Sequence, residues 1–156
     1  MDPNGRYIRQ VVLPEIGLEG QEKLSQASVL CVGAGGLGSP ILLYLAAAGV
    51  GHIGITDFDT VDESNLQRQV LFTTDAVGQS KAVQAKKRLQ ALNPTITIEI
   101  YEEGLNAENA PDLFQSYDII IDGTDNFETK FLINDAAVKY GKPWIYGAIQ
   151  GFDGQA

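Results

Sequence analysis

The sequence predicts an α/β fold, with a doubly wound, mainly parallel sheet and helices on both faces. Short apolar stretches alternate along the chain with longer segments of helical periodicity. One apolar stretch, residues 28–32, runs directly through a glycine-rich turn into a helical pattern. Acidic residues, Asp57 and Asp122, end two later apolar stretches. Because ligands bind at the carboxyl ends of parallel strands, these ends are the expected place for a functional site.

In the first half of the chain, the pattern predicts two helices and two strands. Leu18 and Leu24 are expected to face inward on the first helix. The second helix has Pro40 in its first turn, where the missing N–H does no harm, and Gly49 just past its end. In chain order the predicted elements are helix 17–26, strand 28–32, helix 39–48 and strand 52–57.

In the second half, an irregular connection precedes the next regular elements. Residues 59–74 have no clean period, and we expect a short helical turn near Ser64. Ala85 and Leu89 mark the apolar face of the following helix, and Pro111 interrupts a later one near its middle. The predicted elements are helix 80–92, strand 95–101, helix 106–115, strand 117–122, helix 126–140 and strand 143–148.

Composition narrows the class of protein. A length of 156 residues suits one domain, and 44% hydrophobic with 20% charged residues is ordinary for a soluble globular protein. The net charge of -9 argues against a nucleic-acid partner. A single cysteine excludes a disulfide framework and a cysteine-built zinc site within this chain. There is no membrane-length apolar run and no secretion signal, so we expect no membrane partner and a cytoplasmic protein.

The glycine-rich turn predicts a nucleotide site. Gly33, Gly35 and Gly38 have the G-x-G-x-x-G spacing, which gives a tight turn, close approach of backbone to a phosphate, and close packing of helix on strand. Free N–H groups at the helix start favour an anion. Asp57 ends the next strand, where its carboxylate can accept both ribose hydroxyls, although it could be a solvated strand-end residue. We therefore predict a Rossmann-like domain over 28–156, preceded by an arm and short helix over 1–27.

Three residues beyond that strand are candidates for the same site. Asp59 could bind the ribose or only anchor its loop. Arg68 offers a planar fork for phosphate oxygens, against the alternative of a surface arginine paired with a nearby acid. Lys81 lies in the first turn of its helix, where the dipole disfavours a cation. It could point back toward phosphates or be a solvated lysine.

Asp125 is a candidate for binding Mg²⁺, because it follows the buried strand that ends at Asp122. A carboxylate there can hold the metal against a triphosphate. Thr124 or Asp125 could instead cap the next helix, and both roles can coexist. Cys31 is expected in the core, and His52 has no partner for a metal. The aromatic residues that we expect in the core or in an adenine pocket are Tyr44, Phe72, Trp144 and Tyr146.

Several short motifs together resemble the ThiF/MoeB/HesA family, which are relatives of the ubiquitin-activating enzymes. The pieces are RYIRQ (6–10), GAGGLG (33–38), DFD (57–59), SNLQRQ (64–69), GQSKA (78–82), NP (93–94) and TDN (124–126). The resemblance implies a homodimer that uses Mg·ATP to adenylate the C-terminal glycine carboxylate of a ubiquitin-fold sulfur-carrier protein. Pyrophosphate is released, and the carrier would belong to molybdopterin or thiamine biosynthesis.

The resemblance also implies roles for individual residues. Asp57 would take the ribose, Asp125 the magnesium, and Arg9 the triphosphate of the neighbouring subunit. Arg9, Arg68, Lys81 and Asp125 would act in the reaction. The nucleotide contacts that it implies are Gly33, Gly35, Gly36, Gly38, Asp57, Asp59, Ser64, Asn65, Arg68, Lys81, Asp125 and Asn126.

Some parts of the family pattern are absent from this sequence. The zinc-binding cysteines, a later cysteine and the strands that dock the carrier would lie beyond Ala156. We therefore expect a fragment that binds nucleotide without completing the reaction, with any structural Zn²⁺ in the missing part. Two alternatives stay open: an NAD-linked oxidoreductase, and a non-catalytic module that binds nucleotide or docks a carrier.

Overall fold

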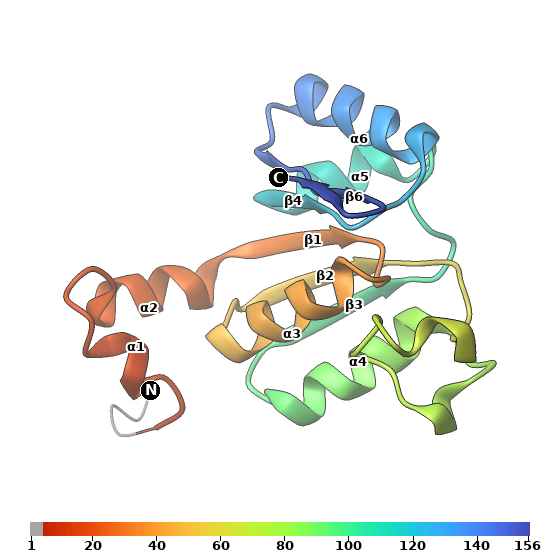
Figure 1. Ribbon diagram of the computed structural model, residues 1–156. Coiled ribbons are helices and arrows are strands. Elements are labelled where there is room, and N and C mark those ends of the chain that lie inside the picture. Colours follow the sequence, from red (N-terminus) through yellow and green to blue (C-terminus); the bar gives the residue numbers. More distant parts are fainter. Residues whose placement is uncertain (1–4) are drawn as a thin grey trace.

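The computed structural model describes residues 5–156 and contains the predicted parallel sheet (Figure 1). The strands are β1 Ser28–Val32, β2 His52–Thr56, β3 Thr97–Tyr101, β4 Ile119–Asp122, β5 Trp144–Ile145, β6 Ala148–Gln150 and β7 Asp153–Gln155. The α-helices are α1 Ile8–Val11, α2 Gly17–Gln26, α3 Gly38–Ala48, α4 Lys81–Leu92, α5 Ala110–Ser116 and α6 Phe127–Tyr140. Two 3₁₀ helices, η1 Glu63–Asn65 and η2 Thr74–Ala76, lie in the irregular connection.

The main sheet has the strand order β3-β2-β1-β4-β5, and every neighbouring pair in it is parallel. Successive residues of β1 alternate between its two faces. Val29 and Cys31 pack in the core that contains residues of α3 and α4, whereas Leu30 and Val32 pack with residues of α5 and α6. Because helices cover both faces, the central strands are apolar on both sides, which explains their continuous apolar sequence.

Two of the predicted elements are wrong in their bounds. The helix expected over 106–115 begins only at Ala110, so Pro111 lies in its first turn and does not interrupt it. The last strand, expected over 143–148, is only Trp144–Ile145 in the main sheet. Residues 148–150 instead pair antiparallel with β7 in a separate hairpin.

The expected position of one side chain is also wrong. Leu18, which was expected to face inward, is 68% exposed. Tyr44 is 78% exposed, so it is not in the core, and its place in an adenine pocket stays a prediction. Leu24 packs against the core as expected, and Phe72 is buried in it. Hydrophobic periodicity shows which face of a helix is apolar, but whether another element covers that face depends on the tertiary arrangement. Among residues 5–156, no helix has both the length and the apolar character needed to cross a membrane.

The N-terminal arm is attached near the amino end of the sheet (Figure 1). Gln10 and Gln21 both donate hydrogen bonds to the carbonyl of Ala48 at the end of α3, at N···O distances of 3.1 and 3.0 Å. The Tyr7 hydroxyl accepts a 2.6 Å hydrogen bond from the side-chain amide of Asn93. These bonds hold α1 and α2 against the C-terminal end of α3, and the opposite end of α3 begins at the glycine-rich turn.

Candidate functional site

The glycine-rich turn between β1 and α3 requires glycine at two positions. Gly33 has φ +90° and donates a 2.8 Å hydrogen bond to the carbonyl of Thr56. A Cβ at Gly38 would collide with the carbonyl oxygen of Gly33. Among the described residues, the backbone N–H groups of Gly35 and Gly36 donate to no other group. Unused N–H groups at the start of a helix form a site for an anion.

Asp57 directly follows β2 and supports this turn. Its Oδ2 accepts a 2.7 Å hydrogen bond from the N–H of Ala34, and its Oδ1 accepts one of 2.9 Å from the N–H of Asp59. Burial raises the pKa of the carboxyl, although the two N–H groups and the charge of Lys81 oppose that shift. Asp57 is therefore not the solvated strand-end residue of the alternative interpretation. Each of its oxygens can accept a second hydrogen bond, so the ribose contact stays a prediction.

Lys81 is buried beside Asp59. Its side chain is 5% exposed, and its Nζ lies 2.9 Å from Oδ2 of Asp59. The backbone adds a 2.9 Å hydrogen bond from the N–H of Lys81 to the carbonyl of Asp59, next to a bridge between Thr60 and Ser80. The alternative of a solvated lysine is wrong. The structure thus brings a cation from the first turn of α4 to the loop that follows Asp57.

Arg68 lies over the glycine-rich turn. A Cβ placed on Gly36 would be 3.6 Å from Cδ of Arg68, and the guanidinium donates to the carbonyl of Ser64 at 3.4 Å. No acidic side chain within residues 5–156 pairs with Arg68, so the alternative of a surface ion pair is wrong. The exposed guanidinium has open donors for an anion beside the unused N–H groups.

Gln69 is a candidate that the sequence interpretation missed. Its side-chain amide donates a 3.0 Å hydrogen bond to Oδ1 of Asn65 and approaches the position of a Cβ on Gly35 to 3.7 Å. Its Oε1 is buried and has no hydrogen-bond partner among the described residues. Asn65 also donates to the hydroxyl of Ser64 at 3.1 Å. No pattern in the sequence separates Gln69 from its polar neighbours, because only its burial beside the turn makes it unusual.

The loop after β4 lies beside the glycine-rich turn, because the N–H of Gly123 donates a 2.8 Å hydrogen bond to the carbonyl of Val32. The alternative in which Thr124 or Asp125 caps the next helix is wrong. Asn126 is the N-cap of α6, and its Oδ1 accepts a 2.9 Å hydrogen bond from the N–H of Thr129. Thr124 bonds to Asp122 instead. Within the described part of the chain, the exposed side chain of Asp125 makes no hydrogen bond or ion pair, which leaves it available for a ligand.

Arg9 is not near these residues. It lies on α1, and its neighbour Gln10 bonds to Ala48, at the end of α3 opposite to the glycine-rich turn (Figure 1). The single chain therefore does not bring Arg9 to its own site.

Cys31 is buried behind the turn, and burial raises the pKa of its thiol to about 12. A thiol that stays protonated at neutral pH is a poor nucleophile, in keeping with its expected place in the core.

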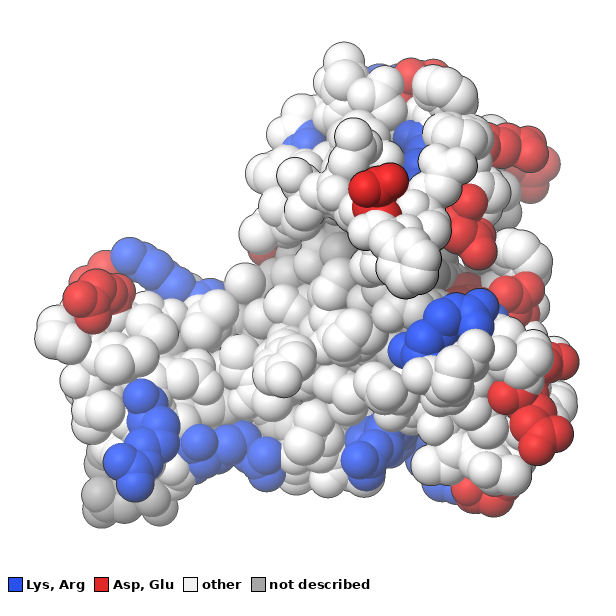
Figure 2. All heavy atoms as spheres, in the orientation of Figure 1, with Lys and Arg blue, Asp and Glu red and all other residues white. Residues whose placement is uncertain are grey.

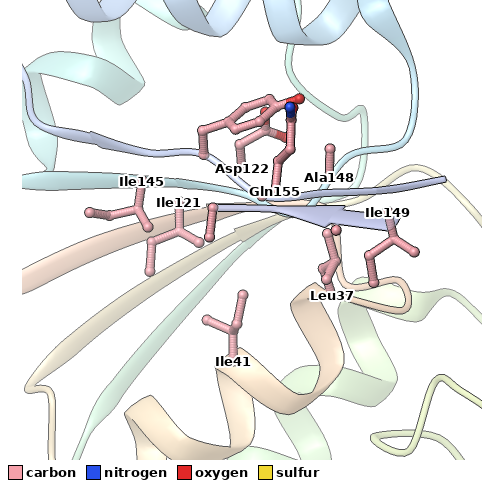
Figure 3. Close-up of a pocket in the computed structure, with 12 residues that line it drawn as sticks. Leu37, Ile41, Ile121, Asp122, Ile145, Ala148, Ile149 and Gln155 are labelled. Carbon is pink, nitrogen blue, oxygen red and sulfur yellow. The ribbon is translucent and has the colours of Figure 1, made fainter. Parts of the chain in front are cut away.

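A cavity of about 390 Å³ adjoins the site between the start of α3 and the C-terminal hairpin (Figure 3). Leu37, Ile41 and Ile121 contribute to an apolar lining, and Asp122 and Gln155 contribute polar atoms. Figure 2 shows a hollowed, largely uncharged region at the centre of this face, with acidic side chains mainly at one rim. The site thus combines an anion-binding turn with an adjacent apolar space.

Together, the parallel sheet, the glycine-rich turn and the acidic residue after β2 define an α/β domain of the Rossmann type. The match to known families is more specific. The chain belongs to the ThiF family, whose model matches residues 7–156. The resemblance inferred from the short motifs is thereby confirmed.

Curated relatives have closely similar sequences. The chain is 57% identical to a sulfur carrier protein adenylyltransferase of Thermus thermophilus, over 96% of this chain and 55% of that protein. It is also 57% identical to the probable adenylyltransferase/sulfurtransferase MoeZ of Mycobacterium tuberculosis, over 97% of this chain and 38% of that protein. The chain therefore spans about half, or less, of the length of these relatives.

Solved structures share the fold. The E. coli MccB structure with ATP superposes with a TM-score of 0.80 at 32% identity, covering 92% of this chain and 44% of that one. The E. coli threonylcarbamoyladenosine dehydratase TcdA, in complex with AMP, gives a TM-score of 0.79 at 26% identity. It covers 89% of this chain and 57% of that one. Both structures were determined with an adenine nucleotide.

Proposed function

We propose that this chain is the nucleotide-binding part of an enzyme that adenylates the C-terminal glycine carboxylate of a ubiquitin-fold sulfur-carrier protein. One observation carries the proposal. Arg68 and Lys81 converge on the loops around an anion-binding glycine turn, in a chain closely similar to a sulfur carrier protein adenylyltransferase. Two cations beside such a turn suit a triphosphate better than the two phosphates of NAD.

The chemistry requires charge neutralisation more than a nucleophilic side chain. A carboxylate oxygen of the carrier attacks the α-phosphorus of ATP, and the bond between that phosphorus and the oxygen bridging to the β-phosphate breaks. Pyrophosphate leaves with the electron pair of that bond. Because the attacking carboxylate is already ionised, no side chain needs to remove a proton. Arg68, Lys81 and the N–H groups of Gly35 and Gly36 would stabilise charge on the phosphate oxygens.

The carboxylates near the glycine-rich turn suit a Mg²⁺ ion that binds together with the nucleotide. Among the described residues no cluster of three or more His, Cys, Asp or Glu side chains could hold a metal ion. Mg²⁺ in nucleotide enzymes is typically bound by one or two carboxylates together with phosphates. The exposed Asp125 would be such a carboxylate. When bound, the ion would neutralise charge on the leaving pyrophosphate.

A homodimer is part of the proposal. Arg9 is exposed on the arm and far from its own site. As the family resemblance implies, it would reach the triphosphate of a neighbouring subunit. The same arm carries the exposed apolar side chains Val12, Leu13 and Leu18. A two-fold dimer would make that contribution reciprocal. Exposed apolar groups on the arm support an interface there.

Ligand-induced stabilisation tests the nucleotide assignment. A ligand that binds only the folded state raises the melting temperature, so Mg·ATP should stabilise the chain and NAD should not. Arg68→Ala should weaken the effect of ATP, whereas Lys139→Ala, an exposed change on α6, should leave it intact. Equal or greater stabilisation by NAD would instead support the oxidoreductase alternative.

Pyrophosphate release tests the reaction. The full-length protein should release pyrophosphate from ATP only when a carrier with a free C-terminal glycine is present. Molybdopterin and thiamine carriers, compared side by side, would identify the pathway. Binding of Mg·ATP without release in the presence of either carrier would favour a non-catalytic module.

A further inference from the structure

Lys130 is a largely buried cation that the proposed function does not use. Its side chain is 11% exposed, and its Nζ lies 2.9 Å from Oδ2 of Asp122, whose side chain is fully buried. Removing two charges from water is costly, and an apolar pair of similar size is often at least as stable. Stabilisation alone therefore does not explain why Lys130 and Asp122 form a buried ion pair.

The position of Lys130 in its helix also indicates a role other than stabilisation. It is the fourth residue of α6, near the N-terminal end, where the helix dipole disfavours a positive charge. Lys81 stands in a comparable place at the start of α4 and also pairs with an aspartate that lies after or at the end of a strand. Departures from local electrostatic preference concentrate at functional sites. The signal that identified Lys81 in the sequence could therefore have identified Lys130.

The contacts of Lys130 join two segments. On one side, Oδ2 of Asp122 accepts from Lys130, while Oδ1 accepts from the N–H and the hydroxyl of Thr124 at 2.9 and 2.6 Å. On the other side, the ammonium donates a 3.0 Å hydrogen bond to the carbonyl of Gly147. It also lies 4.7 Å from the centre of the Tyr146 ring. One ammonium thus connects the loop after β4 with the segment that follows β5.

The segment after β5 is only weakly joined to the rest of the sheet. Only two residue pairs, Ile120 with Trp144 and Ile121 with Ile145, join β5 to β4. Asp122, Tyr146 and Gly147 all line the 390 Å³ cavity beside the glycine-rich turn (Figure 3). The hydrogen bonds of Lys130 therefore extend the link between β4 and β5 to the point where both reach the site.

We propose that Lys130 is a positioning residue that fixes both walls of the site relative to each other. Through Asp122 it holds the loop that carries Thr124 and Asp125, and through Gly147 it holds the start of β6. The inference depends on the proposed function only for what Asp125 does there. Loss of the ammonium leaves a buried carboxylate unpaired and a carbonyl without its donor, so both segments should move more freely.

Hydrogen exchange on the unliganded chain tests this directly. In Lys130→Met, the amides of residues 123–125 and 144–148 should lose protection, while those of β1 should not. Lys139→Met is the matched control, because Lys139 lies on the same helix and also stands over a tyrosine ring, 5.3 Å from the centre of Tyr140. Lys130→Arg should restore protection, since it keeps the charge and the donors. Unchanged protection of both segments in Lys130→Met would overturn the proposal.

A second measurement connects positioning to ligand binding. The Mg²⁺ concentration that gives half of the ATP-dependent rise in melting temperature should increase about 10-fold in Lys130→Met, as for loss of a group that orients a metal ligand. It should be normal in Lys139→Met. An unchanged Mg²⁺ requirement would contradict a role in holding Asp125. If the unaltered chain shows no response to ATP, the proposed function fails, whereas hydrogen exchange still decides the role of Lys130.

If Lys130→Met does not fold, a double variant still tests the role of Lys130 by hydrogen exchange. The double change Asp122→Asn with Lys130→Met removes both charges, so it leaves no unpaired ion in the interior. It should fold and still show loss of protection over residues 144–148, because Gly147 has lost its donor. Full protection of that segment in the double variant would also overturn the proposal.

Discussion

Polar groups at the two ends of the main sheet differ in whether the protein itself supplies their hydrogen-bond partners. Near the amino end, polar side chains satisfy one another. Asp118 accepts hydrogen bonds from the N–H and hydroxyl of Ser28 at 2.9 and 2.7 Å, and these bonds lower the pKa of its carboxyl. The fully buried side chain of Asn93 donates to Tyr7 and to the carbonyl of Ala46, and accepts two bonds from Thr95.

At the carboxyl end, some polar and charged groups are buried at a cost and others have no partner. Burial raises the pKa of Asp57, the N–H groups of Gly35 and Gly36 have no acceptor within residues 5–156, and Oε1 of Gln69 is buried without a partner. Lys81 is buried at the start of a helix. These features cost stability in the unliganded chain.

The difference shows where a ligand is expected. Aspartates, asparagines and tyrosines occur at both ends, so residue type alone does not separate a structural network from a site. What separates them is whether the protein itself supplies each partner. Apart from Nε1 of Trp144, the buried side-chain atom without a partner in the described residues is Oε1 of Gln69, beside the glycine-rich turn. Unmatched groups gathered at that turn indicate that the missing partners come from a bound molecule.

The largest expected effect is the loss of reaction in Asp125→Ala at the carboxyl end. In the full-length protein, carrier-dependent exchange of ATP with pyrophosphate should fall about 100-fold or more, because charge in the transition state loses its metal-held stabilisation. The melting temperature without ligand should hardly change, because Asp125 is exposed. Asp135→Ala, also exposed and on α6, is the control. Intact exchange in Asp125→Ala would remove Asp125 from the site.

Variants of Arg9 test whether the arm of one subunit contributes to the site at the carboxyl end of the sheet in another subunit. Homodimers of Arg9→Ala and of Asp125→Ala should each be nearly inactive. After mixing and re-equilibration, about a quarter of the normal activity should return, because random pairing gives half heterodimers with one intact site each. A mixture that stays inactive would place Arg9 in its own subunit or in a structural role.

Asn93→Ala should affect stability without affecting the site. The change removes the donor to the Tyr7 hydroxyl, one of two donors to the carbonyl of Ala46, and the acceptor of two hydrogen bonds from Thr95. This loss should cost about 2–4 kcal/mol of unfolding free energy. Urea denaturation measures this, with the partly exposed Asn134→Ala as control. The affinity of the folded molecules for Mg·ATP should not change. A large loss of affinity would show that the two ends are coupled.

The smallest effect is a difference in pH dependence between two aspartates. The folded chain raises the pKa of Asp57, so the stability due to this carboxyl is present below its unfolded pKa of about 3.9 and is lost as the pH rises through the folded value. The pKa of Asp118 is lowered instead. Its contribution is present above the unfolded pKa and is lost as the pH falls through the folded value.

Urea denaturation across this pH range measures both contributions. Relative to the unaltered chain, Asp57→Asn should gain stability as the pH rises from 3 toward neutrality. Asp118→Asn should be less stable at neutral pH, by less than about 1 kcal/mol because Asp118 is exposed, and should match the unaltered chain in acid. Identical profiles for the two variants would contradict the distinction between the two ends.

Several features followed from the sequence alone, because they depend on neighbours in the chain. Apolar runs and helical periodicity predicted the alternation of strands and helices and the parallel sheet. The spacing of Gly33, Gly35 and Gly38 predicted the turn, since the steric limits on a tight strand-to-helix turn are local. The unfavourable place of Lys81 in its helix marked it as a candidate for the site, and its contact with phosphates stays a prediction. The joint motifs predicted the family.

Other features depend on contacts between distant segments, and only the tertiary structure decided them. Leu18 and Tyr44 have no covering element, which periodicity could not reveal. Asn126 caps α6, whereas Thr124 bonds to Asp122. Lys130 donates to both Asp122 and the carbonyl of Gly147. The sequence limits which groups can reach the site. Which of them lack a partner depends on long-range packing, because a hydrogen bond or ion pair forms only where the folded chain brings both atoms together.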